Sequence, residues 1–287
     1  MAAARGLPRG VLIDLSGTVH VGSELVAGAA EALANLRQRG VPTLFVSNTT
    51  KTSSRRLHRQ LTEELGLAGV TPSDIMTPLA SARMIIEARG IHNPFLMVSD
   101  DAREEFDGMP PAFPGSSYDA VVVGLAPAFF SYDHLNTAFR AVRRGAPLIA
   151  LHKGKYYATG TTGTDHDLAL GPGAFVAALE FATGAEAEVV GKPSRGFFEL
   201  AAAQLGVPVD SLWMVGDDVR SDIVDSVRAA GLAGGVLVRT GKYRAGDEAQ
   251  LAALAQEGRA CAVAEDLSDA VGKILELAAA AEQTGGA

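Results

Sequence analysis

Short apolar runs alternate with helical patterns along this chain, and their order narrows the fold more than the composition does. Apolar runs at 11–15 and 42–48 are each followed by a helical pattern, at 29–40 and 52–66. The C-terminal third repeats the same order. Because parallel strands need a crossover connection, which is usually a helix, this alternation predicts a sheet covered by helices on its faces. The predicted fold class is α/β, with a Rossmann-like core and a mostly parallel sheet.

The middle of the chain has α/β character of its own. Apolar runs at 95–100, 120–125 and 147–152 are predicted strands, and a helical pattern lies at 132–145. A stretch rich in Gly and Thr follows at 153–167. Long connections in compact domains are often functional, so this stretch is a candidate binding loop, with a surface hairpin as the alternative.

Composition limits the classes of function. The 287 residues carry a net charge of −8 at pH 7, and 47% of them are hydrophobic. Such an acidic chain lacks the basic face that nucleic-acid binding needs, but clustered carboxylates suit a metal cation. No apolar run is long enough to predict a membrane span. The single cysteine, Cys261, allows no disulfide within the chain, and we predict a buried thiol in a cytoplasmic protein.

Polar residues follow several predicted strands, at the edge where open α/β sheets bind ligands. Asp14 ends the first strand, and Ser47 and Asn48 end the second. Asp217 follows a later strand, and Lys192 lies in a G-K-P segment before a helix. Each feature alone is typical of an ordinary turn. Their common place at one sheet edge favours a functional site.

This set of residues fits phosphoryl transfer. Asp14 and Asp217 can share a Mg²⁺ ion, which binds one or two carboxylates and keeps phosphate oxygens among its ligands. Lys192 can neutralise a carboxylate and a phosphoryl oxygen, while Ser47 and backbone N–H groups near Asn48 can bind the other phosphoryl oxygens. Asp14 is then free to attack phosphorus and form an acyl-phosphate.

Four ordered segments, D-L-S-G-T, V-S-N, G-K-P and G-D-D-V-R-S-D, resemble the motifs of the haloacid dehalogenase-like phosphohydrolase superfamily. The spacing resembles that of the branch with a large α/β cap inserted between the second and third motifs. The resemblance implies a core domain formed by 1–78 and 188–287, and a cap domain at 79–187. It also implies a Mg²⁺-dependent phosphatase that forms an aspartyl-phosphate.

The same resemblance implies a role for each matching residue. The implied metal ligands are Asp14, the backbone carbonyl of Ser16, Asp217 and Asp222. Asp14 is also the implied catalytic nucleophile, which Lys192 positions together with the phosphate. Ser47, with Asn48 beside it, is the implied phosphoryl-binding residue. For Asp218 two roles are left open: a supporting role near the metal, or a helix cap.

The implied cap carries two further candidates. His152 and Lys153 follow one of its predicted strands and are candidate substrate-binding residues. The substrate is expected to be a phosphorylated small molecule or phosphoprotein. Because caps of this type often pair, a homodimer is expected, with neither nucleic acid nor membrane as a partner.

Ser16 departs from the family pattern, because most phosphatases of the superfamily have aspartate there. That aspartate protonates the leaving group and then activates water, and general acid–base catalysis of this kind contributes roughly 10²–10⁴-fold. Serine has no comparable acidity, so we expect a preference for activated bonds: pyrophosphate, phosphoramidate or aryl phosphate. The alternative is a pseudophosphatase that binds phosphate or a protein partner with little turnover. His20 could replace the acid, but we expect it to face solvent in a turn.

Other classes of protein fit less well. A signalling receiver domain places its acidic pair on the first strand and has a shorter chain. The chain has neither the G-x-x-x-x-G-K-[ST] of a nucleotide-binding P-loop nor a G-x-G-x-x-G after the first strand.

Overall fold

The computed structural model describes residues 7–109, 115–158 and 168–284. The chain forms two compact units. Unit 1 contains Met1–Ser47, Leu57–Met76 and Lys192–Ala287, and unit 2 contains Asn48–Arg56 and Thr77–Gly191. Residues 48–56, which the predicted division places in the core domain, pack with unit 2.

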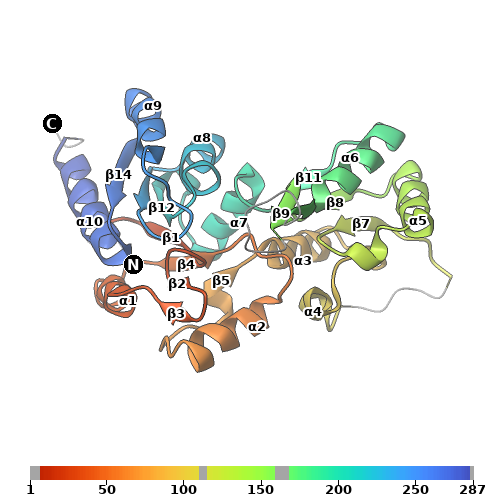
Figure 1. The fold of residues 1–287 in the computed structure, drawn as a ribbon, viewed down its shortest axis with the longest axis horizontal. Coiled ribbons are helices and arrows are strands. Elements are labelled where there is room, and N and C mark those ends of the chain that lie inside the picture. Colours follow the sequence, from red (N-terminus) through yellow and green to blue (C-terminus); the bar gives the residue numbers. More distant parts are fainter. Residues whose placement is uncertain (1–6, 110–114, 159–167, 285–287) are drawn as a thin grey trace. The chain divides into compact units, whose positions relative to one another are not determined.

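Unit 1 is built on a six-stranded parallel sheet with the order β14-β13-β12-β1-β4-β5. Its strands are β1 (Gly10–Asp14), β4 (Thr43–Val46), β5 (Ile75–Met76), β12 (Leu212–Gly216), β13 (Gly234–Val238) and β14 (Ala260–Ala264). In Figure 1 the red β1 lies beside the blue β12, so both ends of the chain build this sheet. The strand order reverses beside β1, which is where open α/β sheets bind ligands.

The helices of unit 1 cover the sheet because its strands are apolar on both faces. Val11 and Ile13 of β1 pack in one cluster with residues of α1 (Ala29–Gln38) and α10 (Leu267–Thr284). Leu12, which points to the opposite face, is also fully buried. The other helices are α7 (Arg195–Leu205), α8 (Asp225–Ala230) and α9 (Leu251–Gln256), and β2 (His20–Val21) pairs with β3 (Glu24–Leu25). Residues 54–56 of α2 (Ser54–Arg59) belong to unit 2 and residues 57–59 to unit 1.

Unit 2 has its own parallel sheet, with the order β11-β8-β7-β6. The strands are β6 (Pro94–Met97), β7 (Ala120–Val123), β8 (Leu148–Ala150) and β11 (Glu188–Val189). The helices are α3 (Pro78–Ala88), α4 (Asp100–Arg103), α5 (Tyr132–Arg143) and α6 (Pro172–Thr183). One apolar cluster includes residues of α3 and a second includes residues of α5 and α6, so helices cover both faces of the sheet. The predicted α/β fold class is confirmed.

Several local predictions differ from the structure. The predicted helix at 52–66 is α2 followed by a π-helical turn at Gln60–Glu64. In the C-terminal third, a π-helical turn at Val219–Val224 precedes α8. Cys261 is half-buried, because β14 is an edge strand. In the predicted loop at 153–167, β9 (Tyr156–Ala158) pairs with β10 (Leu168–Leu170), and 159–167 lie outside the described residues.

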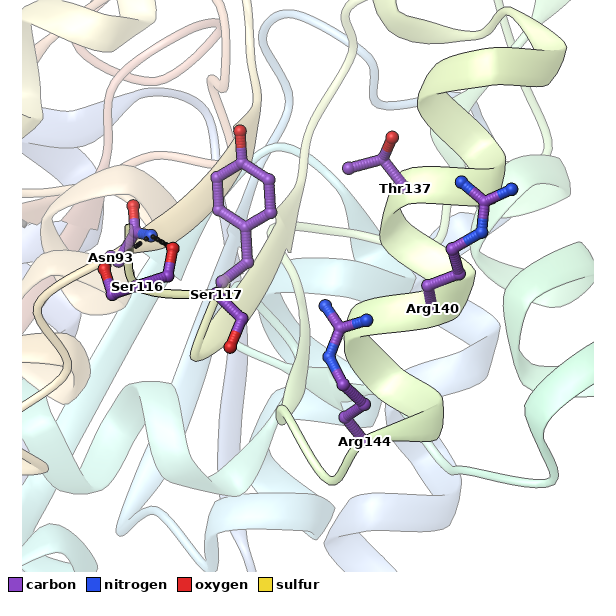
Figure 2. A pocket seen from close by; sticks show the side chains of 7 residues that line it. Asn93, Ser116, Ser117, Thr137, Arg140 and Arg144 are labelled. Carbon is purple, nitrogen blue, oxygen red and sulfur yellow. Dashed lines mark hydrogen bonds between the residues drawn. The ribbon is translucent and has the colours of Figure 1, made fainter. Parts of the chain in front are cut away.

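An open cavity of about 380 Å³ lies on unit 2 (Figure 2). Its lining residues are Asn93, Ser116, Ser117, Tyr118, Thr137, Arg140 and Arg144. Arg140 and Arg144 lie at the C-terminal end of α5, where cations complement the helix dipole. The helix dipole therefore explains why the two arginines lie there, and no bound ligand is needed to explain them. Among the described residues, no helix is both long and apolar enough to span a bilayer.

Candidate active site

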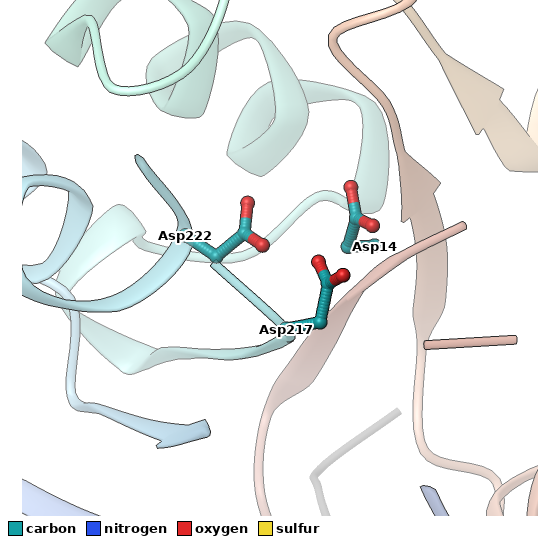
Figure 3. A group of neighbouring side chains, drawn as sticks. All are labelled: Asp14, Asp217 and Asp222. Atoms are coloured by element: carbon teal, nitrogen blue, oxygen red, sulfur yellow. The ribbon is translucent and has the colours of Figure 1, made fainter. Parts of the chain in front are cut away.

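Three buried carboxylates converge at the carboxyl end of the unit 1 sheet (Figure 3). Asp14 is the last residue of β1, Asp217 directly follows β12, and Asp222 lies in the π-helical turn before α8. One oxygen from each carboxylate lies within 4.8 Å of the others. Because β1 and β12 are neighbouring parallel strands, their ends bring Asp14 and Asp217 to the same edge.

Lys192 joins two of these carboxylates. Its Nζ donates to Asp14 Oδ1 at 2.5 Å and lies 2.9 Å from Asp222 Oδ1. It also donates to the Val46 carbonyl at the end of β4, at 3.2 Å. The Lys192 side chain is only 1% exposed. A lysine this deeply buried requires anionic partners, and the two carboxylates supply them.

Burial and mutual repulsion change the acidity of the cluster. Burial raises the pKa of Asp14 to about 7; Asp222 and Asp217 act in the same direction, and Lys192 opposes them. Burial also raises the pKa of Asp217. Burial alone would lower the pKa of Lys192, but Asp14 and Asp222 outweigh it and raise the value. The cluster therefore holds three carboxylates but one buried ammonium, which contacts only Asp14 and Asp222, so a further positive charge would stabilise it.

The hydrogen bonds of the Asp217 carboxylate indicate whether a divalent cation fits at this site. Its Oδ2 accepts a hydrogen bond from the Lys242 backbone N–H at 2.7 Å. Its Oδ1 is buried and has no hydrogen-bond partner within the described part of the chain. An unsatisfied buried carboxylate oxygen is costly unless a ligand meets it. The free oxygen, in a cluster of three carboxylates, matches the oxygen ligands that Mg²⁺ prefers.

Asp218 has a defined local contact. Its Oδ1 accepts hydrogen bonds from the backbone N–H groups of Arg220 at 3.1 Å and Ser221 at 3.0 Å, as a helix cap does. Its own N–H donates to Asp222 Oδ2 at 3.1 Å. Of the two roles left open by the sequence, Asp218 performs the capping one and also helps to orient Asp222.

Ser47 and Asn48 follow β4, as predicted. Ser47 is buried, and its backbone N–H donates to the Met76 carbonyl at 3.0 Å. Asn48 belongs to unit 2, where its Oδ1 lies close to Gly191. Phosphoryl binding by these two residues stays a prediction.

Ser16 and His20 lie in the turn after β1. Ser16 is exposed and forms an isolated bridge with His20. The expectation that His20 faces solvent is wrong, because its ring is buried and its Nδ1 lies 2.9 Å from the Gly22 carbonyl. The local hydrogen bond explains why the ring turns inward. The same bond occupies one ring nitrogen.

His152 and Lys153 follow β8 in unit 2. The Lys153 Nζ donates to both carboxylate oxygens of Glu180, at 2.7 and 2.9 Å. His152 Nδ1 accepts from the Gly154 N–H at 3.1 Å, and burial lowers the pKa of His152. Both residues therefore have local partners within unit 2. Substrate binding by them stays a prediction.

The sequence reasoning assigned no role to residues 240–242, which form the turn that follows β13. Within it, the Lys242 N–H holds Asp217 Oδ2, and the Thr240 hydroxyl donates to the Gly17 carbonyl. The sequence signal that could have found it was position, because a T-G-K segment that begins two residues after a parallel strand lies at the same sheet edge as Asp14.

Comparison with known proteins shows the family to which this chain belongs. A model described as haloacid dehalogenase-like hydrolase matches residues 11–109, and one described as HAD-hydrolase-like matches residues 189–270. Haloacid dehalogenase-like hydrolase domain-containing protein 2 of Rattus norvegicus is 45% identical over 87% of this chain and 91% of its own length. The chain belongs to the haloacid dehalogenase-like hydrolases.

Other members of the haloacid dehalogenase-like hydrolases are also similar. Phospholysine phosphohistidine inorganic pyrophosphate phosphatase of Bos taurus is 36% identical over 93% of this chain and 94% of its own length. The p-nitrophenyl phosphatase of Archaeoglobus fulgidus superposes with a TM-score of 0.76 at 25% identity, covering 93% of this chain and 99% of that one. The family resemblance seen in the sequence is confirmed, and the chain is a phosphatase of this family.

Proposed function

We propose that this protein is a Mg²⁺-dependent phosphohydrolase that uses Asp14 as its nucleophile and acts on activated phosphate bonds. One observation carries the proposal: Lys192 joins Asp14 to Asp222, while the buried Asp217 Oδ1 beside them has no hydrogen-bond partner among the residues that the structure describes. A structural ion-pair network would satisfy every oxygen, whereas a site for a cation and a phosphoryl group leaves one open.

In the first step, a carboxylate oxygen of Asp14 attacks phosphorus and forms an aspartyl-phosphate. The bond from phosphorus to the leaving group breaks, and the leaving group takes the electron pair. Lys192 supports this step because its ammonium orients the Asp14 carboxylate and can also balance charge on the phosphoryl oxygens. Water then attacks the aspartyl-phosphate at phosphorus, which releases phosphate and restores Asp14.

Asp14, Asp217, Asp222 and the Ser16 carbonyl would hold the Mg²⁺ ion. When bound, the ion supplies positive charge that stabilises the anionic phosphoryl group. The three carboxylates already lie close enough for one ion to contact them.

Ser16 determines which leaving groups are expected. An exposed serine hydroxyl cannot protonate an alkoxide at neutral pH, and the buried His20 has one ring nitrogen occupied by a local contact. A phosphate or phenolate leaves as a more stable anion, and a phosphoramidate nitrogen can be protonated from solvent. The two related phosphatases, named for pyrophosphate, phosphoamino acids and p-nitrophenyl phosphate, support this class of substrate.

A leaving-group series tests this proposal. We expect Mg²⁺-dependent release of phosphate from pyrophosphate, phosphohistidine and p-nitrophenyl phosphate, with kcat/KM at least about 10²-fold above that for glycerol phosphate. Asp14→Asn is the matched control, because it keeps the shape of the side chain and removes the nucleophile. Equal rates on alkyl and activated substrates would contradict the assignment of Ser16, and turnover by Asp14→Asn would contradict the nucleophile.

Ser16 is also the observation that favours a second candidate, a pseudophosphatase that binds phosphate or a protein partner. In that case the wild type would bind inorganic phosphate in the presence of Mg²⁺ but release none from any member of the series. Buried Asp14, Lys192 and Asp217 argue for the active enzyme, because a retained but unused charge cluster costs stability.

We further propose a phosphorylated small molecule or phosphoprotein as substrate and a homodimer as the assembly. The homodimer is supported by the exposed apolar side chains of unit 2. Cytoplasmic location stays a prediction, for which the single cysteine is the support.

A further inference from the structure

The turn Thr240–Lys242, which follows β13, is bonded to both loops that carry the candidate metal ligands. The Lys242 backbone N–H donates to Asp217 Oδ2 at 2.7 Å. The Thr240 hydroxyl donates to the Gly17 carbonyl, three residues after Asp14. A third loop, which contributes no carboxylate to the cluster, therefore connects the ends of β1 and β12.

Two glycines enclose the same carboxylate oxygen. A Cβ atom on Gly241 would lie 2.0 Å from Asp217 Oδ2 and 2.6 Å from the Cα of Gly17. A Cβ atom on Gly17 would lie 1.9 Å from the same oxygen. Both glycines have positive φ, 55° at Gly241 and 94° at Gly17, which other residues rarely adopt. The two backbones thus pack against Oδ2 more closely than any side chain would permit.

The two carboxylate oxygens of Asp217 therefore have different surroundings. Oδ2 is enclosed by the glycines and hydrogen-bonded, while Oδ1 is buried and has no partner among the described residues. Because a carboxylate is planar, holding one oxygen also sets the direction of the other. A ligand whose orientation is set by folding loses less conformational entropy when it binds its ion.

We propose that the Thr240–Lys242 turn is a positioning element for the cation site, which fixes Asp217 so that Oδ1 is presented to the divalent ion. The inference rests on the proposed function in so far as it takes Asp217 as a metal ligand. In this proposal, backbone groups of the turn and the absence of a side chain at Gly241 hold Asp217 in position. Outer contacts that orient a metal ligand are typically worth 10–100-fold in affinity.

Gly241→Ala and Gly246→Ala form a matched pair for the test. Both replace a glycine of positive φ, 55° and 101°, in the same region of the chain. Only the Gly241 substitution meets atoms, because a Cβ on Gly246 has nothing within 4 Å. Mg²⁺ affinity is measured by titration calorimetry, and thermal unfolding is followed in the absence of metal. We expect Gly241→Ala to weaken Mg²⁺ binding about 10–100-fold and Gly246→Ala to leave it within about twofold.

Side-chain variants separate the turn from its lysine. Lys242→Gln keeps the backbone N–H and removes a positive charge, so it should bind Mg²⁺ at least as tightly as the wild type. Thr240→Val removes the bond to Gly17 and should weaken binding, whereas Thr240→Ser should restore it. The Thr240 pair also keeps the test decisive if Gly241→Ala does not fold.

The proposal is overturned if Gly241→Ala binds Mg²⁺ like the wild type, if both glycine variants weaken binding equally, or if Lys242→Gln weakens it as much as Gly241→Ala. Absence of Mg²⁺ binding by the wild type would overturn it as well. These measurements need no substrate. If the wild type binds Mg²⁺ but hydrolyses no phosphate compound, the proposed function fails while the role of the turn stands.

Discussion

Asp14 is the residue on which the chemistry depends, and its charge is only partly balanced. Lys192 contacts it at 2.5 Å, but the same lysine also neutralises Asp222. Burial outweighs the lysine and raises the pKa of Asp14 to about 7. A nucleophilic carboxylate must be ionised, so the metal-free site is poorly prepared for attack at neutral pH. A bound cation would favour the ionised form and reverse this.

This pKa predicts that metal binding releases protons. Because the pKa of Asp14 in the metal-free protein is raised to about 7, Mg²⁺ binding should release protons at neutral pH and should tighten as the pH rises from 6 to 8. Titration calorimetry in buffers of different ionisation enthalpy measures this release. Asp14→Asn is the control, and release of the same size from that variant would contradict the assignment.

The raised pKa of Asp14 also determines how its contribution to folding stability changes with pH. The folded pKa of Asp14 lies above its ordinary value of 3.8, so its contribution to stability is fully present below about pH 3.8 and is lost as the pH rises through about 7. Asp14→Asn should therefore stabilise the metal-free protein more at pH 8 than at pH 5. Urea unfolding at the two pH values measures the difference, and a reversed order would contradict the raised pKa.

At the scale of elements, the site is held by strand ends that approach each other closely. Gly216 ends β12, and a Cβ placed there would lie 2.3 Å from Asp222 Oδ2. The π-helical turn at Val219–Val224 brings Asp222 back over the end of its own strand. Sheet and turn therefore fit together only when the strand ends in glycine.

Gly216→Ala should destabilise the protein by about 1–3 kcal/mol, because the added methyl group overlaps a buried carboxylate. Gly196→Ala is the matched control, since Gly196 lies in α7 with nothing within 4 Å of an added Cβ. Because Gly196 lies in the first turn of α7, that change should leave the free energy of unfolding unchanged or raise it slightly. Urea unfolding of both variants checks this, and equal effects at the two positions would speak against the close fit.

Strand-end residues were predictable because parallel strands carry their C-terminal ends to one edge. The closeness of Asp14 and Asp217 follows from that geometry. The place of Lys192 does not, because the strand that precedes it, β11, belongs to the sheet of unit 2. The Thr240–Lys242 turn was missed because its contact with Asp217 uses a backbone N–H, which every residue except proline offers. His20 was placed wrongly because its burial depends on a local contact with Gly22, which no apolar periodicity reveals.

At the scale of the whole molecule, the two units differ in what they expose. Tyr132, Tyr156, Leu170 and Phe181 are large, exposed apolar side chains, and all belong to unit 2. Phe181 on α6 is 93% exposed and Tyr132 on α5 is 82% exposed. A groove of about 290 Å³ between α5 and α6 is lined mainly by apolar residues. Such surfaces often mark interfaces.

We expect the protein to be a homodimer joined through exposed apolar side chains of unit 2, Phe181 among them. Phe181→Glu places a charge in the apolar surface and should shift the dimer towards monomer, as measured by light scattering after size-exclusion chromatography. Val21→Glu is the control, because Val21 is an exposed apolar residue of unit 1. A monomeric wild type, or dissociation by Val21→Glu alone, would contradict this interface.

The α/β class and the alternation of elements could be predicted because the apolar runs are well separated by helical patterns. The bounds of the two units could not be predicted, because residues 48–56 follow β4 closely in the sequence yet pack with unit 2. Membership in a unit depends on long-range contacts, which local residue patterns do not report.

Whether Asp14 carries the transferred phosphoryl group can be tested by trapping the intermediate. The wild type is mixed with labelled pyrophosphate and Mg²⁺, quenched in acid within the first turnover, and digested for peptide mapping. We expect the label on Asp14, in the peptide that contains VLIDLSGT, and none in Asp14→Asn. Label on another residue, or phosphate release by Asp14→Asn at the rate of the wild type, would show that Asp14 is not the nucleophile.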